Sequence, residues 1–252
     1  MKLDLPYIRT QLANREIHHH ESIPSTMPEA IRLAAEGAPT GSAVIADEQT
    51  AGHGRYGRTW HSEPNSGLYV SVILRFKFTP EQLPVTTLAL GLAVTEAIQQ
   101  AANITCDLRW PNDVLIADKK CAGILTQTEG AAVIAGIGIN VNHTSFPAEL
   151  ASHATSLRIA SGREQSREKL LIAMLPAIDF YCALLAGKGR EPILDMFSHA
   201  SSYVSGRRVT VDQGDSILSG TTAGLNESGF LLLQRDDGRQ NLIIAGGVRP
   251  CS

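Results

Sequence analysis

The hydrophobic pattern of the chain changes near residue 205, and this change limits the possible folds more than any other feature of the sequence. Before residue 205, apolar runs of strand length alternate with longer stretches of helical character. After it, four short apolar runs are separated by turn-forming segments rich in Asp, Asn and Gly, a pattern typical of a small antiparallel barrel or sandwich. We therefore predict two domains, residues 1–205 and residues 206–252.

The first of these domains is predicted to combine strands with helices. Thr26 and Glu29 have the spacing of a helix-capping box, and Gly37 marks the end of that helix. Apolar residues spaced by four and three predict another helix over residues 170–187, which we judge too short and too polar to span a bilayer. Strands are expected at 43–46, 68–76, 104–110, 121–129 and 131–140, and a buried helix is expected at 84–102.

Charge and cysteine content exclude several classes of protein. The 252 residues carry 22 basic and 25 acidic side chains, a net charge of −3, which argues against a polyanion as the main partner. The four cysteines are scattered and form no CxxC pair, so a reducing cytoplasm is expected rather than a disulfide framework or a cysteine-rich zinc site. The N-terminal residues lack the apolar run of a secretory signal.

The loop at residues 51–60, with the sequence AGHGRYGRTW, is the most unusual segment. Its glycines would let the backbone approach a ligand, and Arg55 and Arg58 could clamp a phosphate or a carboxylate. The segment is neither a P-loop nor a dinucleotide fingerprint, because no Gly-Lys-Ser/Thr follows and a strand rather than a helix comes next. A solvated surface loop is the alternative interpretation.

A second group of candidates lies at residues 109–123. The sequence Arg-Trp-Pro-Asn-Asp at 109–113 is turn chemistry, but it could also present an amide and a carboxylate opposite Lys120, across a short hairpin. Lys120 begins an apolar strand, where a partly buried ammonium would need an anionic or carbonyl partner. Earlier in the chain, Ser25 and Thr26 would cap a helix, whose N-terminus also offers donors to a polar ligand.

Three consecutive histidines at 18–20 invite a metal assignment. In an extended strand, however, adjacent side chains point to opposite faces, and no carboxylate or cysteine set accompanies these histidines. The sequence therefore predicts no metal site there.

Taken together, these segments resemble the biotin–protein ligases (biotin–[acetyl-CoA-carboxylase] ligases). The matching stretches, in family order, are 21–26, 46–60, 109–113, 120–125, 136–142 and 246–249. Each is weak alone, but the ordered set is highly specific and runs over essentially the whole chain. The resemblance implies an α+β fold with a mixed β-sheet and flanking helices, as in class II aminoacyl-tRNA synthetases, followed by a small SH3-like β-barrel.

The resemblance also implies a reaction. ATP and biotin would give biotinyl-5′-adenylate and pyrophosphate, and the biotinyl group would then pass to a lysine of the biotin carboxyl carrier protein of acetyl-CoA carboxylase. Magnesium is expected because ATP is a substrate, although no dedicated carboxylate cage is visible.

The family's site residues carry over position by position. The implied catalytic residues are Lys120, Arg55 and Asp113, with Asp113 orienting or deprotonating the incoming lysine. The implied biotin site comprises Ser25, Thr26, Met27, Gln49, Gly52, His53, Gly54, Arg55, Lys120 and Gly123. The implied ATP or adenylate site comprises Arg55, Arg58, Trp60, Asn112, Lys120, Asn140 and Arg249.

The chain departs from the family pattern at several positions. His53 and Tyr56 stand where the family's loop often has arginine, and Arg109 stands where lysine is common. Regulatory members carry a winged helix-turn-helix in front of the ligase. Only 24 residues precede Ser25, so we predict a ligase without a repressor domain and without operator binding. No membrane association is expected, and both a monomer and a homodimer are compatible with the sequence.

Two other functions stand as alternatives. A lipoate or octanoyl ligase or transferase shares the catalytic architecture, although the loop at 51–60 and the turn at 109–113 favour biotin. A non-enzymatic module that binds anions or nucleic acid with the same arginines is disfavoured by the net charge of −3.

Overall fold

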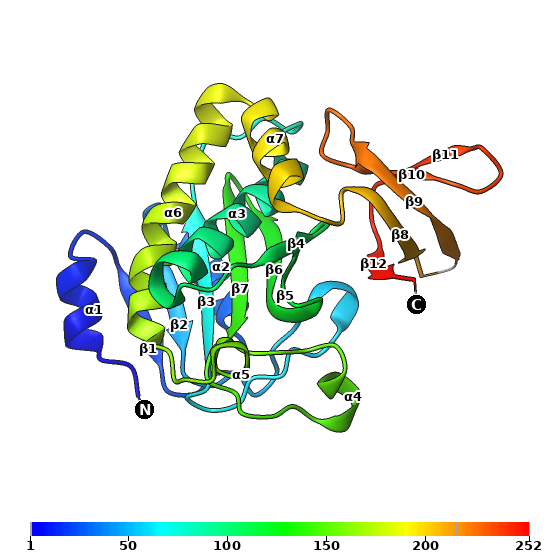
Figure 1. Cartoon of the computed structure of the whole chain (residues 1–252). Helices are drawn as coiled ribbons and strands as arrows, with labels where there is room; N and C mark the ends of the chain where they lie inside the picture. The colour runs from blue at the N-terminus through cyan, green and yellow to red at the C-terminus, as the bar shows by residue number, and fades with distance from the viewer. Residues whose placement is uncertain (1, 215, 252) are drawn as a thin grey trace.

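The computed structural model describes residues 2–214 and 216–251 and contains two β-sheets (Figure 1). The larger sheet has the strand order β1-β2-β3-β7-β6-β5-β4. Its β1–β2 pair is parallel and its other neighbouring pairs are antiparallel, so the sheet is mixed, as predicted. The strands are β1 Ile17–His20, β2 Ala43–Ala46, β3 Gly67–Leu74, β4 Asp107–Arg109, β5 Asp113–Ile116, β6 Lys119–Glu129 and β7 Ala132–Asn140.

Helices cover the two faces of the larger sheet unequally. The helices α3 (Leu83–Ala102) and α6 (Arg167–Lys188) pack on one face and build the main core, with α7 (Glu191–Ala200) beside them (Figure 1). The opposite face is covered in part by α2 (Thr26–Ala35), which packs against apolar residues of β2, β3 and β7. The shorter elements are α1 Leu5–Gln11, the 3-10 turn η1 Arg55–Gly57, α4 Ala148–Ala151 and α5 Leu157–Ser161.

The helix α6 is longer and more apolar than the sequence pattern predicts. By length and composition alone it could cross a membrane, and it is the one helix of the described residues with that property, so our estimate of its length and polarity is wrong. Half of its most apolar window is buried inside the protein. The buried residues of α6 include Leu171, Met174 and Leu175, and they belong to the core that α6 shares with α3. Its packing is that of a core helix.

The smaller sheet has antiparallel strands in the order β11-β10-β9-β8-β12. They are β8 Ser205–Asp212, β9 Ile217–Leu225, β10 Leu231–Gln234, β11 Gln240–Ile243 and β12 Gly247–Pro250. The predicted antiparallel sheet is confirmed, whereas among the described residues β11 and β12 form no pair that would close a barrel. The indole Nε1 of Trp110 donates to the Gly229 carbonyl at 2.9 Å and so ties the larger sheet to the smaller one.

The start of α2 differs from the predicted capping box. Ser25, not Thr26, is the N-cap, and its hydroxyl accepts a hydrogen bond from the Met27 N–H. Glu29 binds Arg32 on the same helix instead of reaching back to the cap. The Ser25 cap leaves the Thr26 side chain free to face the sheet, which matters for the site below.

Two strands also differ from the sequence pattern. The strand expected at 104–110 is limited to 107–109, because Asn103 ends α3 in a left-handed conformation and the next residues cross to the sheet. The pattern does not predict β5, since Pro111-Asn112-Asp113 has turn composition and a second turn follows at Ala117 and Asp118, both with positive φ. Only four residues of strand lie between these turns.

Candidate active site

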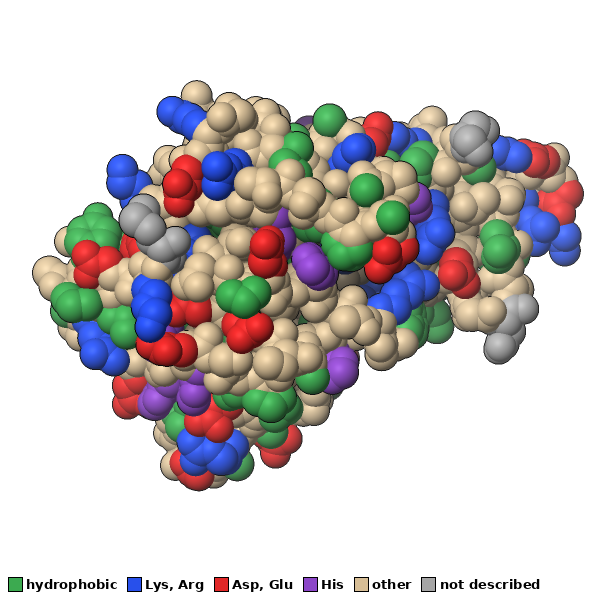
Figure 2. Space-filling model, turned by 90° about the horizontal axis from the view of Figure 1, so that it is seen from below, with side chains coloured by type: hydrophobic (Ala, Val, Ile, Leu, Met, Phe, Trp, Pro, Cys, Tyr) green, Lys and Arg blue, Asp and Glu red, His purple; other side chains and the backbone are tan. Residues whose placement is uncertain are grey.

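A cavity of about 250 Å³ lies on the face of the larger sheet that α2 covers only in part. Its lining comes from the start of α2, the loop at 53–61, the β4–β5 turn, β6, β7, residues 146–154 and residues 246–248. Figure 2 shows a hollow in the surface, with histidine and Lys or Arg side chains at the edge of the hollow. Segments distant in the sequence therefore meet around one space.

The floor of the cavity is glycine backbone. Gly136 and Gly138 lie two residues apart on β7 and so face the same side, and Gly123 of β6 is the cross-strand partner of Gly138. A Cβ atom at Gly138 would lie 2.5 Å from Cε2 of Trp60, and one at Gly136 would lie 2.8 Å from Sδ of Met27. Because no side chain rises from the floor, the Trp60 and Met27 side chains lie directly on the sheet.

A polar group of side chains lies where α2 begins. The Oε1 atom of Gln49 accepts hydrogen bonds from the backbone N–H of Thr26 at 2.9 Å and from its hydroxyl at 3.2 Å. The Thr26 hydroxyl also lies 2.7 Å from that of Ser71 on β3. Ser25, Thr26 and Gln49 all line the cavity. They form a fixed set of donors and acceptors that can bind a small polar group.

The glycine–arginine loop folds over the cavity as a hairpin. The Gly54 N–H donates to the Arg58 carbonyl at 2.7 Å, and the Trp60 N–H donates to the Gly52 carbonyl at 2.9 Å. Tyr56 occupies the tip with a φ of 58°, and the residue is 62% exposed. The loop has defined hydrogen bonds over a cavity, which favours the functional interpretation over a solvated surface loop.

Two arginines connect this loop with other parts of the site. Arg55 donates to Oδ1 of Asn112 at 3.0 Å and to the Gly246 carbonyl at 3.4 Å, and Arg58 lies 3.5 Å from Asp212 of β8. No carboxylate pairs with Arg55 in the described part of the chain, so its charge is available to an anionic ligand.

Asp113 lies between two cations at the cavity wall. Its Oδ1 atom is 2.5 Å from Nζ of Lys120, and its Oδ2 atom is 2.8 Å from Arg109. Burial opposes the ionised form, but Lys120 and Arg109 outweigh burial and hold the pKa of Asp113 below its ordinary value of 3.8. The ion-paired carboxylate therefore suits a positioning role better than a role as proton acceptor.

A β-bulge brings Lys120 to the same side as Asp113. In the β5–β6 ladder Asp113 faces Gly123, but the register shifts between Val114 and Leu115, so that Leu115 faces Lys120. Without this shift Lys120 would point to the helix-covered face of the sheet, because side chains alternate along a strand. The bulge is the local feature that forms the Lys120–Asp113 pair.

The structure brings together all but two of the predicted site residues. Asn112 is fixed by its Nδ2 donating to the Ile124 carbonyl at 3.0 Å, and Asn140 donates to the Thr155 carbonyl at 3.1 Å, and both line the cavity. Gly52 is buried, Arg249 is exposed on β12, and neither lines the cavity. The remaining predicted residues, Ser25, Thr26, Met27, Gln49, His53, Gly54, Arg55, Arg58, Trp60, Asp113, Lys120 and Gly123, line the cavity.

Other residues of the site are not predicted by the sequence reasoning. Residues 146–154, which include α4, contribute Phe146, Leu150 and His153 to the lining, and the loop contributes His61. The glycine floor could have been found, because glycines at 136 and 138 recur with the period of a strand. Behind His61 lies His143; burial, together with the nearby His61, lowers the pKa of its imidazole to about 4.

Comparison with known proteins agrees with this geometry. Residues 20–143 match the profile described as Biotin/lipoate A/B protein ligase family, and residues 204–248 match that of the Biotin protein ligase C terminal domain. Bifunctional ligase/repressor BirA of Bacillus subtilis is 35% identical over 246 residues, which cover 94% of this chain and 75% of that protein. Biotin--[acetyl-CoA-carboxylase] ligase of Mycobacterium tuberculosis is 31% identical over 229 residues, with coverages of 88% and 84%.

The fold of this chain is also similar to that of a solved structure. Biotin protein ligase from Aquifex aeolicus, in complex with biotin and ATP, matches with a TM-score of 0.82 and 31% identity over 94% of this chain and 99% of that one. Fold and cavity together define a member of the biotin/lipoate ligase class. Within that class, the chain belongs to the biotin protein ligase family.

Proposed function

We propose that this chain is a biotin–[acetyl-CoA-carboxylase] ligase that works in two steps. In the first, a carboxylate oxygen of biotin attacks the α-phosphorus of ATP, and pyrophosphate leaves. In the second, the amine of a carrier lysine attacks the acyl carbon of biotinyl-5′-adenylate, and AMP leaves. The observation that carries the proposal is the single cavity, around which the residues expected for biotin and for the adenylate meet in a chain of this family.

The biotin end of the cavity is proposed to be the polar group at the start of α2. Thr26 and Gln49 are fixed by hydrogen bonds to each other and by the contact of Thr26 with Ser71, and the Ser25 hydroxyl is held by the Met27 N–H. This arrangement suits the ureido ring of biotin, which presents one carbonyl and two N–H groups. Met27, which lies on the glycine floor, would contact the apolar part of the ligand.

The first step brings two anions together, and the site supplies cations to neutralise them. We infer that Arg55, which has no carboxylate partner among the described residues, and Lys120 lie along the biotin carboxylate and the α-phosphate. Arg58, Trp60, Asn112 and Asn140 are proposed to lie on the adenylate side. Arg249, outside the cavity lining, would need to turn inward to join them.

The second step requires a neutral lysine amine in line with the acyl carbon. A lysine has a solution pKa of about 10.4, so it must lose a proton before it attacks. Asp113 is proposed to orient this amine. Because Lys120 and Arg109 keep Asp113 ionised, orientation is its better-supported role, and deprotonation would require Lys120 to turn first to the phosphate.

The glycine–arginine loop is proposed to shield the intermediate from water. Acyl-adenylates hydrolyse readily, and a loop that orders over the ligand excludes the solvent. In this structure the loop is already held by Asn112 and by the Gly246 carbonyl. Loss of these contacts would open the cavity on the side of the smaller sheet.

Magnesium is proposed to enter with ATP rather than to occupy a protein cage. Among the described residues that line the cavity, Asp113 supplies the only carboxylate, and two cations already engage it. A Mg²⁺ ion bound mainly by phosphate oxygens and water fits this lining.

The remaining finer assignments are also proposals. We place the catalytic domain at 1–205 and the second domain at 206–252, and a relationship of the smaller sheet to SH3-like barrels stays a prediction. The acceptor is proposed to be a biotin carboxyl carrier protein in a reducing cytoplasm, in line with four free cysteines. A homodimer stays a prediction that sedimentation can test.

The decisive experiment measures pyrophosphate release from ATP with biotin or with lipoate as the acid. Biotin-dependent release, followed by mass increase of an added carrier domain, is the expected result. Release with lipoate alone would assign the chain to the lipoate branch. No release with either acid, although both bind, would leave a binding module and contradict the proposal.

A further inference from the structure

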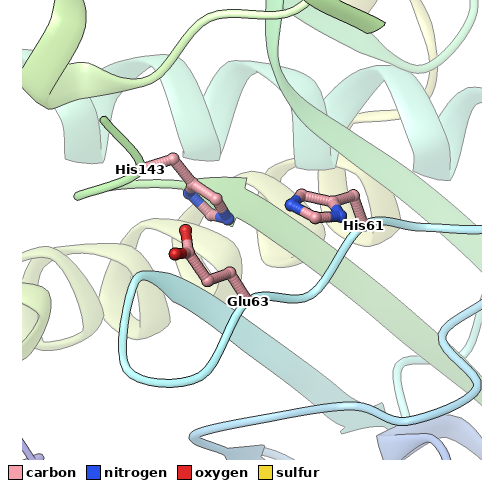
Figure 3. A group of neighbouring side chains, drawn as sticks. All are labelled: His61, Glu63 and His143. Atoms are coloured by element: carbon pink, nitrogen blue, oxygen red, sulfur yellow. The ribbon is translucent and has the colours of Figure 1, made fainter. Parts of the chain in front are cut away.

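Two histidines and a glutamate lie together beside the cavity, apart from the residues assigned to biotin and ATP. His61 and Glu63 belong to the loop that precedes β3, and His143 follows the end of β7. One nitrogen from each imidazole and one carboxylate oxygen lie within 4.8 Å of one another. Figure 3 shows the Glu63 carboxylate and the His61 ring pointing toward the ring of His143.

One ring nitrogen of the buried member of this cluster lacks a hydrogen-bond partner. His143 is completely buried, and its Nδ1 atom bonds to nothing among the described residues. Its Nε2 atom lies 3.5 Å from the Tyr69 hydroxyl, the outer limit of a hydrogen bond. The ring is held in place by Phe146, which stacks on it with 5.2 Å between the ring centroids. A fixed, buried imidazole with one nitrogen unpaired has a polar atom that a ligand can satisfy.

The carboxylate of the cluster is also free of competition. Glu63 is exposed, and its side chain makes no ion pair in the part of the chain that the structure describes. Its backbone carbonyl accepts a hydrogen bond from the buried Tyr69 hydroxyl at 3.1 Å, which fixes the loop beside His143. The carboxylate can therefore move closer to the histidines without losing another contact.

We propose that His61, Glu63 and His143 bind a divalent transition-metal ion of the zinc type. Two imidazoles and one carboxylate form a donor set that zinc accepts, with a fourth position left for water. Ligand atoms around tetrahedral zinc lie roughly 3.3 Å apart, so the widest separation in the cluster, up to 4.8 Å, must shorten by as much as about 1.5 Å. Rotation of the exposed Glu63 and the partly exposed His61 side chains provides this movement.

The bound ion would tie the segment after Trp60 to the segment after β7. His61 and Phe146 both line the cavity, so the ion would fix one of its walls without contacting Arg55 or Lys120. This assignment is independent of the ligase reaction, and it predicts metal binding in the absence of biotin and ATP.

The test is a calorimetric titration of chelator-treated full-length protein with ZnSO₄, without biotin or ATP. All variants carry His18→Gln and His20→Gln, so that the histidine run does not contribute. One equivalent of zinc is expected to bind. Because even outer partners of metal ligands change affinity by about 10–100-fold, His61→Ala and Glu63→Gln should each weaken binding at least tenfold. The control His153→Ala removes a cavity histidine outside the cluster and should leave the zinc affinity unchanged.

A second readout separates metal ligation from a loss of structure. Co²⁺ in place of Zn²⁺ should give the visible absorption of a four-coordinate ion in the parent protein, which carries only His18→Gln and His20→Gln. Glu63→Gln in this parent should abolish the absorption. Glu63 is exposed, so this substitution removes no core packing. No saturable zinc binding, equal affinity in the parent and both cluster variants, or an equal loss in His153→Ala would each overturn the proposal.

Discussion

Replacing Gly138 with alanine tests whether the glycine floor positions Trp60. The new Cβ atom would lie 2.5 Å from Cε2 and 2.7 Å from Nε1 of the indole. Carbon atoms in contact are normally about 3.5 Å apart, so the ring must rise from the sheet by about 1 Å. The backbone of Trp60 cannot follow freely, because its N–H is bonded to the Gly52 carbonyl.

The size of the effect follows from this clash. Adding a methyl group to a packed site typically costs about 1–3 kcal/mol. If the displaced indole belongs to the adenylate side, the affinity for ATP should fall by roughly 5-fold to 150-fold. Binding of biotin at Ser25 and Gln49 should change much less, because neither side chain contacts the new methyl group.

Pyrophosphate release at saturating biotin, with ATP varied, measures the KM for ATP in this variant. Thermal unfolding of the same sample shows whether the floor is strained in the absence of ligand. Gly187→Ala is the matched control, because it adds the same methyl group where nothing lies within 4 Å. If Gly138→Ala keeps the wild-type KM for ATP and does not lower the unfolding temperature, Trp60 does not depend on the floor and the reasoning fails.

Three further predictions concern the charged groups. Lys120→Ala removes one partner of a largely buried ion pair, a change that typically costs about 2–5 kcal/mol. Adenylate formation should therefore slow by roughly thirty-fold to several thousand-fold. Pyrophosphate exchange within a few-fold of wild type would contradict this. Asp113→Asn should form biotinyl-adenylate but transfer the biotinyl group slowly, whereas Arg55→Ala should release the adenylate, which then labels bystander lysines. Single-turnover transfer from preformed adenylate separates these two effects. A normal transfer rate with impaired adenylation would assign Asp113 to the nucleotide site. The pKa of Asp113 lies below 3.8, so its contribution to stability is complete above that pH and is lost as the pH falls through the folded-state value. Urea unfolding of wild type and Asp113→Asn should therefore differ equally at about pH 8 and about pH 5 and converge only below pH 3.8; convergence already at pH 5 would contradict the lowered pKa.

Local patterns in the sequence were sufficient to predict much of the fold. The buried helix α3, the helix α6 and the strands β2, β3, β6 and β7 follow from spacing and turn residues that act over a few positions. The strand β5 did not follow, because four residues between two turns carry no periodic signal. Its pairing between β4 and β6 depends on the whole sheet rather than on its own residues.

The site shows a similar division between local and distant information. The glycine–arginine loop and the 109–113 turn are visible in the sequence because their composition is unusual. Their meeting is not, since the contact of Arg55 with Asn112 depends on the strand order and on a loop that crosses the cavity. The Lys120–Asp113 pair also depends on the β-bulge between β5 and β6, and no residue type there predicts a register shift.

The contact of the glycine–arginine loop with the smaller sheet couples the stability of the sheet to the binding of ligand under the loop. Arg58 lies next to Asp212 of β8, yet no residue of that strand, all of which are described, lines the cavity. If a ligand immobilises the loop, the same coupling free energy must hold the sheet more firmly, because linkage acts equally in both directions. Amide hydrogen exchange in β8 should then slow when biotin and ATP bind. Conversely, a carrier protein that shifts this sheet changes the retention of the adenylate by the same factor.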